Sequence, residues 1–402
     1  MNAFKRNIPL LAVCQALMMS GGSLIIITTA LVGQALAEDK SWATLALATQ
    51  FIATMLTTIP AALLMERIGR KAGFMLAALI GTAGAGLACL AILAGDFRWF
   101  VAGTALVGIF NGFGNYYRFA AADAVADDQK SRAVSYIMAG GVVAAFVGPN
   151  LANLTRDLFA SAPFAGSYAA LAGLYLLALA VLAFLRLPPP STGTGRVELL
   201  PKGRPLTVIA AQPAFIVALI CGMFGYGVMV LVMTATPLAM QSHAHHFADT
   251  AFVIQWHVLG MFAPSFVTGH LIRRHGVQRI MFIGAMLGLG CVMINLAGSK
   301  VIHFWTALLL LGVSWNFLFI GATTLLTETY RPMERARAQA LNDFAVFTTV
   351  AVSSLSAGAL LNHYGWRMVN LGVLPMLALI LASILWGMSL RRDRNKNDGM
   401  VE

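Results

Sequence analysis

Residues 62–71 read Ala-Leu-Leu-Met-Glu-Arg-Ile-Gly-Arg-Lys, a charged turn between two long apolar stretches. A related turn, Gly-His-Leu-Ile-Arg-Arg-His-Gly-Val-Gln, occupies residues 269–278, which is 207 positions further along. Because this separation is close to half of the 402 residues, it indicates an internal duplication. The two copies are then expected to form matching charged turns on one side of a membrane.

The composition is that of an integral membrane protein. Hydrophobic residues make up 59% of the chain and charged residues 11%, and the mean hydropathy is +0.78. A water-soluble globular protein needs more charge than this on its surface. The apolar runs of about 20 residues favour membrane-spanning helices over a β-barrel.

The formal net charge of +11 does not indicate a nucleic-acid partner, because the cations lie in short turns between apolar runs. The four cysteines all fall inside apolar runs without ligand spacing, so we interpret them as small buried hydrophobic residues. We expect no cofactor and no metal site. The first apolar run is too long for a signal peptide and is expected to remain as a helix.

Hydropathy predicts an all-α membrane protein with twelve transmembrane helices in two pseudo-symmetric six-helix bundles. The expected domains are an N-terminal bundle (1–187), a cytoplasmic linker rich in Pro, Gly and basic residues (188–205), and a C-terminal bundle with a short basic tail (206–402). The predicted spans are 8–31, 42–65, 72–94, 99–122, 133–153, 165–187, 213–239, 249–272, 278–298, 302–326, 338–361 and 367–389.

The distribution of Lys and Arg predicts the orientation. Most of these residues lie at the termini, in the linker and in the turns after even-numbered spans. Because cytoplasmic loops are enriched in Lys and Arg, both termini are expected in the cytoplasm of a bacterial cell, with the chain in the inner membrane.

The two halves also align beyond the charged turns, and polar residues pair across the repeat. Asn111 corresponds to Asn316 and Asp123 to Glu328 at an offset of 205, and Gln50 corresponds to His257 at an offset of 207. Matched polar residues within matched spans are expected of the parallel repeats of a transporter.

The turn Glu66-Arg67-Ile68-Gly69-Arg70-Lys71 resembles the signature turn of the major facilitator superfamily, Gly-x-x-x-Asp-Arg-x-Gly-Arg-Arg/Lys. Here Ala62 replaces the leading Gly and Glu66 replaces the Asp. The second copy has Arg273 at the position of the acid, which argues against an acid-dependent latch in that half. The resemblance covers the whole chain and implies two bundles that rock around a central site.

Two shorter stretches bear on the direction of transport. Gly140, Gly141 and Gly148-Pro149 are similar to the fifth-helix motif of exporters in this superfamily, without its trailing glycine pair. By contrast, residues 255–269 together with Asn342-Asp343-Phe344 resemble bacterial riboflavin importers of the superfamily. The two resemblances therefore imply opposite directions.

In this superfamily the substrate cavity is lined chiefly by helices 1, 4, 7 and 10, which have no carboxylate near their midpoints here. Amides and aromatic rings suit a flat, neutral, hydrogen-bonding solute. Each such residue has an alternative role in packing or in bonding helix to helix. The candidate substrate-binding residues are Gln15, Gln50, Asn111, Asn115, Tyr116, Tyr226, His257, Trp315 and Asn316.

A cytoplasmic gate is expected from charges at the helix ends, with Glu66, Arg67, Arg70, Arg118, Asp123 and Glu328 as its candidates. Pairs between these charges would hold the gate shut, and they must be modest in strength if the gate is to open. The alternative is that the cations only follow the inside-positive rule, and that Arg118 reaches the interface by snorkelling.

Two ionisable residues are candidates for proton coupling, Asp343 and His257. The alternative for Asp343 is a helix cap, and the alternative for His257 is a satisfied helix contact.

The leading hypothesis is therefore a secondary active transporter that imports a small, largely neutral solute, a vitamin-like heterocycle such as riboflavin. The alternative is proton-coupled efflux of drugs or metabolites. An enzyme or sensor is not expected. The sole candidate for such a site is His243-Ala-His245-His246, which we interpret as an exposed turn. The expected partners are the solute, the lipid bilayer and protons, and we expect a monomer.

Overall fold

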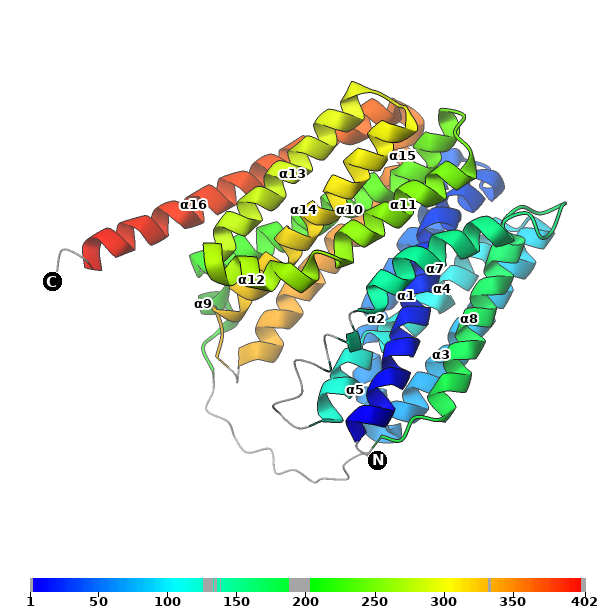
Figure 1. The fold of residues 1–402 in the computed structure, drawn as a ribbon, viewed down its shortest axis with the longest axis horizontal. Coiled ribbons are helices and arrows are strands. Elements are labelled where there is room, and N and C mark those ends of the chain that lie inside the picture. The colour runs from blue at the N-terminus through cyan, green and yellow to red at the C-terminus, as the bar shows by residue number, and fades with distance from the viewer. Residues whose placement is uncertain are drawn as a thin grey trace.

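The computed structural model describes residues 3–125, 133, 136–137, 139–187, 203–331 and 334–398. These residues form helices and contain no strand, and the helices gather into two elongated bundles that lie side by side (Figure 1). The first half of the chain forms one bundle, which we call the N bundle, and the second half forms the other, the C bundle. The predicted fold class is confirmed. The predicted linker falls almost wholly outside the described residues, so the domain boundaries stay a prediction.

The N bundle begins with the longest helix of that half and ends with the helix that precedes the predicted linker. Its elements are α1 (Ala3–Leu36), η1 (Lys40–Trp42), α2 (Leu45–Ile68), α3 (Arg70–Ala94), α4 (Phe97–Gly114), α5 (Tyr117–Asp123), α7 (Gly140–Thr155) and α8 (Ala165–Ala183).

The C bundle repeats this arrangement after a short helix that follows the predicted linker. Its elements are α9 (Leu206–Ala210), α10 (Pro213–Ser242), α11 (Phe247–Phe262), α12 (Ser265–His275), α13 (Val277–Ala297), α14 (Val301–Thr327), α15 (Arg335–Gly372) and α16 (Leu374–Asp398).

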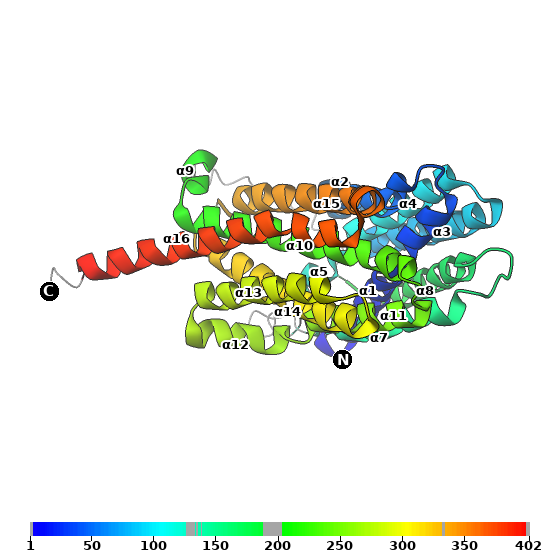
Figure 2. The same cartoon turned by 90° about the horizontal axis from the view of Figure 1, so that it is seen from above.

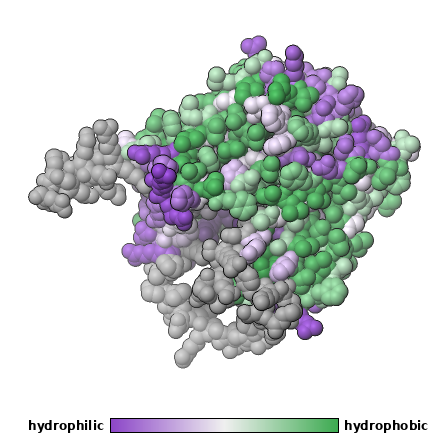
Figure 3. Space-filling model, viewed as in Figure 1, coloured by the Kyte–Doolittle hydropathy of each residue, from purple (hydrophilic) through white to green (hydrophobic). Residues whose placement is uncertain are grey.

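The predicted spans match these helices, with breaks that hydropathy did not show. In the described part of the chain, eight helical stretches are long and apolar enough to cross a membrane, and α11 with α12 forms a further one bent by 43°. The fourth predicted span is divided between α4 and α5. The kink at Gly365 inside α15 lies in the predicted gap between the last two spans. The space-filling view shows hydrophobic residues over the middle of the molecule and hydrophilic residues toward its ends (Figure 3).

The duplication is visible in the backbone of the two charged turns. Gly69 joins α2 to α3 with φ 86° and ψ 150°, and Gly276 joins α12 to α13 with φ 86° and ψ 146°. This region of φ is open to glycine and costly for residues with a Cβ atom. Both turns therefore need glycine for the same reason. We call the end of the molecule that carries them the basic end, and the end that carries η1 the η1 end.

Glycine also lets helices approach closely inside each bundle. A Cβ atom on Gly108 of α4 would collide with the backbone oxygen of Gln50 in α2, and one on Gly312 of α14 would collide with that of His257 in α11. Close backbone approach at small residues is how helices pack tightly in a membrane. Because Gln50 and His257 are matched by the repeat, the two bundles share this contact.

Arg204, at the end of the predicted linker, is held to the C bundle by Glu334. Its guanidinium donates to both carboxylate oxygens, Nη2 to Oε2 at 2.7 Å and Nε to Oε1 at 3.0 Å. The Arg204 guanidinium, with the Arg331 backbone N–H, lowers the pKa of the Glu334 carboxyl from 4.5 to about 2. This ion pair fixes the start of the C bundle at the basic end.

The left-handed turn gives a first prediction. Gly276→Ala should lower the melting temperature of the purified protein, because a Cβ at φ 86° costs roughly 1–2 kcal/mol although the space around it is open. Gly269→Ala is the matched control: it also has open space but lies inside α12, where Ala is favoured. Equal melting temperatures for the two variants would contradict this explanation.

A second prediction concerns acid stability. A carboxyl whose pKa is lowered by folding stabilises the native state at pH values above its pKa in the unfolded state. This contribution is lost as the pH falls toward its pKa in the folded state. The wild-type melting temperature should therefore fall between pH 4.5 and pH 2 more steeply than that of Glu334→Gln. Parallel curves for the two proteins over this range would show that the ion pair contributes nothing.

Candidate transport site

The two bundles are joined at the η1 end by hydrogen bonds. Ser41 of η1 and His363 of α15 lie 2.9 Å apart (Oγ to Nε2), and the Thr44 hydroxyl donates to the Leu355 carbonyl at 3.2 Å. The Gly358 N–H in turn donates to the Thr44 hydroxyl at 3.2 Å. Seen from above, α15 lies beside α2 (Figure 2). This end of the interface is closed by α2, η1 and α15.

A second set of contacts joins α7 to α11. The Asn150 amide donates to the Gln255 side-chain oxygen at 2.9 Å. Arg156, which follows α7, lies over the rings of Phe164 and Phe247 at 5.5 and 5.3 Å. A cation over an aromatic face is attracted by the ring quadrupole. From this closed end the ribbons of the two bundles diverge toward the basic end (Figure 1).

An aromatic cluster lies on the face of the C bundle that meets the N bundle. Trp315 and Phe319 are four residues apart on α14, so they share one helix face, and their rings stack at 4.9 Å and 10°. The Tyr226 ring of α10 is in T-shaped contact with both rings, with centroid distances of 5.3 Å to Trp315 and 5.5 Å to Phe319. Phe262, at the end of α11, lies 6.1 Å from Trp315. We call these four residues the aromatic cluster.

Phe262 connects the aromatic cluster to the N bundle. A Cβ atom on Gly141 of α7 would lie 2.7 Å from the Phe262 ring. The indole nitrogen of Trp315 is buried and has no hydrogen-bond partner among the described residues. Since an unpartnered buried donor is costly, this nitrogen is available to a ligand or a water molecule.

The N bundle contributes amides at the point where its fourth span breaks. Asn115 and Tyr116 lie between α4 and α5 and are partly exposed, and the Tyr116 hydroxyl donates to the Thr58 carbonyl at 2.9 Å. The buried side-chain oxygen of Asn111 has no partner within the described ranges. Gln15 and Gln50 are 8% and 4% exposed, and the Gln50 side-chain oxygen is likewise unpartnered among described residues. Unsatisfied acceptors thus gather in the N bundle.

Two of the predicted substrate contacts are used inside the C bundle. The Asn316 amide donates to the Met261 carbonyl at 2.7 Å and to the Ser265 hydroxyl at 2.6 Å, and its oxygen accepts from Thr268 at 2.6 Å. The side chain is fully buried and its bonds hold α14 to the bend between α11 and α12. It has little capacity left for a solute.

The His257 imidazole is also fully buried, and its Nδ1 lies 2.8 Å from the Leu308 carbonyl. Its Nε2 has no partner in the described part of the chain. The ring therefore sits in the contact between α11 and α14.

The predicted gating residues gather at the basic end. Glu66, Arg67 and Glu328 are exposed. The Asp123 side chain lies outside the described residues, so its predicted pairing stays a prediction. Arg70 and Glu328 each interact with another group of the protein.

The neighbouring Lys71 donates to the Ala183 carbonyl at 2.7 Å, which places a cation at the C-terminus of α8.

Arg118 of the N bundle and Asp343 of the C bundle interact electrostatically across the basic end. Both residues are exposed, and within the described ranges they form no ion pair. The Arg118 guanidinium lies 4.8 Å from the ring of its neighbour Phe119. The sequence pattern did not predict this electrostatic attraction, because the two residues belong to different bundles.

The cysteines and the histidines after α10 are not part of the site. The four cysteines are buried and unpaired. Among the histidines of the turn after α10, the His245 Nε2 lies 2.6 Å from the Ser299 carbonyl. In the part of the chain that is described, no group of three metal-ligating side chains comes together.

The sequence interpretation did not select Phe262 and Phe319 for the site. Phe319 had a usable signal, since it lies four residues after Trp315. Phe262 had none of that kind, because it contacts Trp315 from a different helix, α11, which packs against α14.

Two repeated helical bundles that close at one end around polar and aromatic groups define a secondary transporter of small solutes. The comparisons with known proteins agree with this class. The family model described as Major Facilitator Superfamily matches residues 11–254 and 220–400, and this chain belongs to that family.

The relatives extend over almost the whole chain. The riboflavin transporter RfnT of Brucella anthropi is 44% identical over 95% of this chain and 96% of its own length. The uncharacterized MFS-type transporter YdeG of Bacillus subtilis is 26% identical over 95% of this chain and 92% of its own. A crystal structure of a D-xylose–proton symporter has the same fold, with a TM-score of 0.72 at 14% identity, covering 94% of this chain and 96% of that one.

Proposed function

We propose that this protein imports riboflavin, or a closely similar flat heterocycle, across the bacterial inner membrane by alternating access. The proposal is supported by the 44% identity to a protein named as a riboflavin transporter and by the aromatic cluster between the bundles. The observation that carries it is the stacked pair Trp315 and Phe319, with an unpartnered indole N–H, in the described residues at the bundle interface.

The chemistry of the site suits such a solute. Flat aromatic faces stack on a heterocycle, and stacking on aromatic side chains is worth roughly 1–3 kcal/mol per ring in nucleic-acid sites. The Trp315 N–H offers a donor, and the Asn111 and Gln50 oxygens offer acceptors. We propose these residues as contacts, together with Gln15, Asn115, Tyr116 and Tyr226, and we omit Asn316 and His257, whose side chains are used in helix contacts.

The inside-positive rule supports an orientation with the basic end and both termini in the cytoplasm. On that orientation the η1 end faces outward, and its cross-bundle hydrogen bonds close the outer side. The described conformation is then the one that releases solute inward. The opposite conformation would bring the basic ends of the bundles together and open the η1 end.

The charges at the basic end provide the proposed inner gate. Closing it would bring Arg118 toward Asp343, and the Glu66–Lys71 turn of the N bundle toward the end of α14 in the C bundle. Because surface ion pairs contribute about 0–1 kcal/mol each, such a gate can open and close within a transport cycle.

We assign proton coupling to Asp343 in preference to His257. Asp343 is exposed and faces a cation of the other bundle, whereas His257 is fully buried inside one bundle. The Asp343 carboxylate can neutralise Arg118 only while it is ionised. Closure of the gate would therefore depend on the protonation state of Asp343.

Export is the second candidate direction, and the observation that favours it is Gly148-Pro149 inside α7. A Cβ atom on Gly148 would lie 2.6 Å from the Ser23 side chain, so α7 and α1 are closely packed there. Transport measured separately in whole cells and in inside-out vesicles distinguishes import from export.

The third prediction tests the solute and the site together. Cells that lack their own riboflavin uptake should accumulate radiolabelled riboflavin when they carry this chain. Trp315→Leu should raise KM roughly tenfold, a loss of about 1.4 kcal/mol, because it removes the stacking face. Trp305→Leu is the matched control, since Trp305 is on the same helix and packs against Trp256 at 5.8 Å.

No uptake above that of vector controls would remove riboflavin as the solute. Equal KM values for the two tryptophan variants would remove the aromatic cluster as its site.

The fourth prediction concerns coupling. Wild-type uptake should rise as the external pH falls and should collapse with an uncoupler, whereas Asp343→Asn should lose both dependences and still bind solute. Glu38→Gln, which removes an exposed acid at the η1 end, should behave as wild type. Proton dependence that survives in Asp343→Asn would assign coupling to another group.

A further inference from the structure

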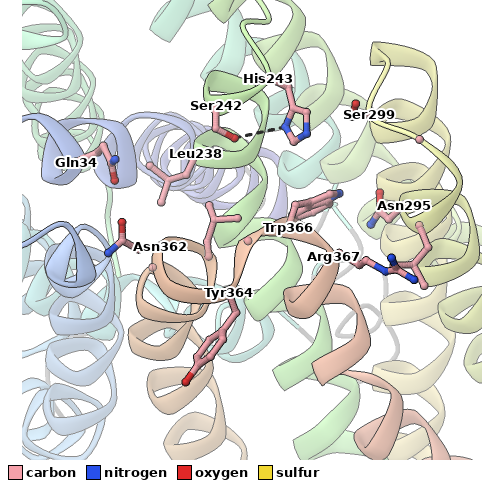
Figure 4. A pocket seen from close by; sticks show the side chains of 15 residues that line it. Gln34, Leu238, Ser242, His243, Asn295, Ser299, Asn362, Tyr364, Trp366 and Arg367 are labelled. Atoms are coloured by element: carbon pink, nitrogen blue, oxygen red, sulfur yellow. Dashed lines mark hydrogen bonds between the residues drawn. The ribbon is translucent and has the colours of Figure 1, made fainter.

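A cavity of about 710 Å³ lies at the η1 end, apart from the aromatic cluster. Its walls are the C-terminal ends of α10 and α13 and the kinked part of α15 around Gly365, and Gln34 of α1 completes them from the N bundle (Figure 4). A volume of this size is typical of small-molecule sites. The cavity is therefore large enough for a solute and is built by both bundles.

Two buried polar atoms in its wall have no partner in the described residues. They are the indole nitrogen of Trp366 and the side-chain oxygen of Asn295, whose residues are 8% and 3% exposed. Asn295 donates through its nitrogen to Asn370 at 2.8 Å, so its oxygen remains open. In Figure 4 the Trp366 ring extends toward Asn295.

One atom is a donor and the other an acceptor. A hydroxyl group can serve both at once, because it donates one hydrogen bond and accepts others. Neighbouring amides of Gln34 and Asn362 add further polar groups to the wall. The pocket thus has the hydrogen-bonding pattern of a site for a hydroxylated molecule.

The charge of the wall is positive. Arg367 lines the cavity and is exposed, and Lys300 follows directly after the lining residue Ser299. The lining contains no Asp or Glu. Arg is suited to phosphate recognition because its planar guanidinium donates two parallel hydrogen bonds.

We propose that this cavity binds a small hydroxylated phosphate, of the sugar-phosphate class, and that the bound molecule slows transport. Because Gln34 belongs to the N bundle, the complete wall exists while the bundles are together at the η1 end. A ligand that prefers one conformation shifts the population toward it. Occupancy would hold the η1 end closed and reduce the return to the other conformation.

This proposal rests on alternating access and not on the identity of the transported solute. A binding test therefore separates it from the riboflavin proposal. The probe is ribose 5-phosphate, and the comparison ligands are ribose and inorganic phosphate, each added to the purified full-length protein in detergent.

Ribose 5-phosphate at saturating concentration should raise the melting temperature by about 3 °C or more, whereas ribose and inorganic phosphate should raise it less. The shift should disappear in Arg367→Gln and in Trp366→Phe, which keeps a ring against Phe304 and removes the N–H. Arg98→Gln, which removes a cation at the η1 end of the N bundle, should keep the full shift.

In proteoliposomes, the same probe added on the η1 side should reduce the maximal rate of solute transport at least twofold in the wild type. The rate in Arg367→Gln should not change. No shift in the wild type, or an equal shift in Arg367→Gln, would overturn the site. An equal shift with inorganic phosphate would overturn recognition of the hydroxyl groups. Stabilisation by phosphatidylglycerol in nanodiscs, without any by ribose 5-phosphate, would overturn the sugar-phosphate assignment in favour of a lipid headgroup.

Discussion

Close helix approach at glycine is the constraint on which the rest of this structure depends. Lipid tails are as apolar as leucine, so no hydrophobic force drives helices together within the bilayer, and tight van der Waals contact takes its place. Gly108 and Gly312 provide that contact in the two bundles, where any Cβ atom would collide with a neighbouring backbone oxygen. Each bundle is thereby locked internally, and relative movement is confined to the surface between them.

The contacts across that surface are of a different kind. At the η1 end they are hydrogen bonds such as Ser41 to His363 and a cation lying over two rings, which contribute about 1 kcal/mol each. A few bonds of this strength can be exchanged for another set without unfolding either bundle. The difference between glycine contacts within the bundles and polar contacts between them is what an alternating-access transporter needs.

The aromatic cluster touches this surface through Phe262. Trp315 and Phe319 are fixed by their own helix, and Phe262 reaches Gly141 of the other bundle. A solute stacked there would be in contact with both bundles and could sense their relative position. The cavity around Trp366 has the same property at the η1 end, which is why we consider it a place where a second molecule could act on transport.

The sequence by itself determined the spans, the duplication and the two charged turns, because hydropathy, spacing and charge can be followed along the chain. It did not determine which polar residues remain available. Asn111 and Asn316 are equivalent in the repeat, yet the Asn316 amide makes three hydrogen bonds, whereas the Asn111 oxygen has none within the described residues. The bend between α11 and α12 brings Ser265 and Thr268 to Asn316, and the attraction between Arg118 and Asp343 acts between two bundles. Such contacts depend on how helices are rotated and bent against their neighbours, and only the tertiary structure decided that.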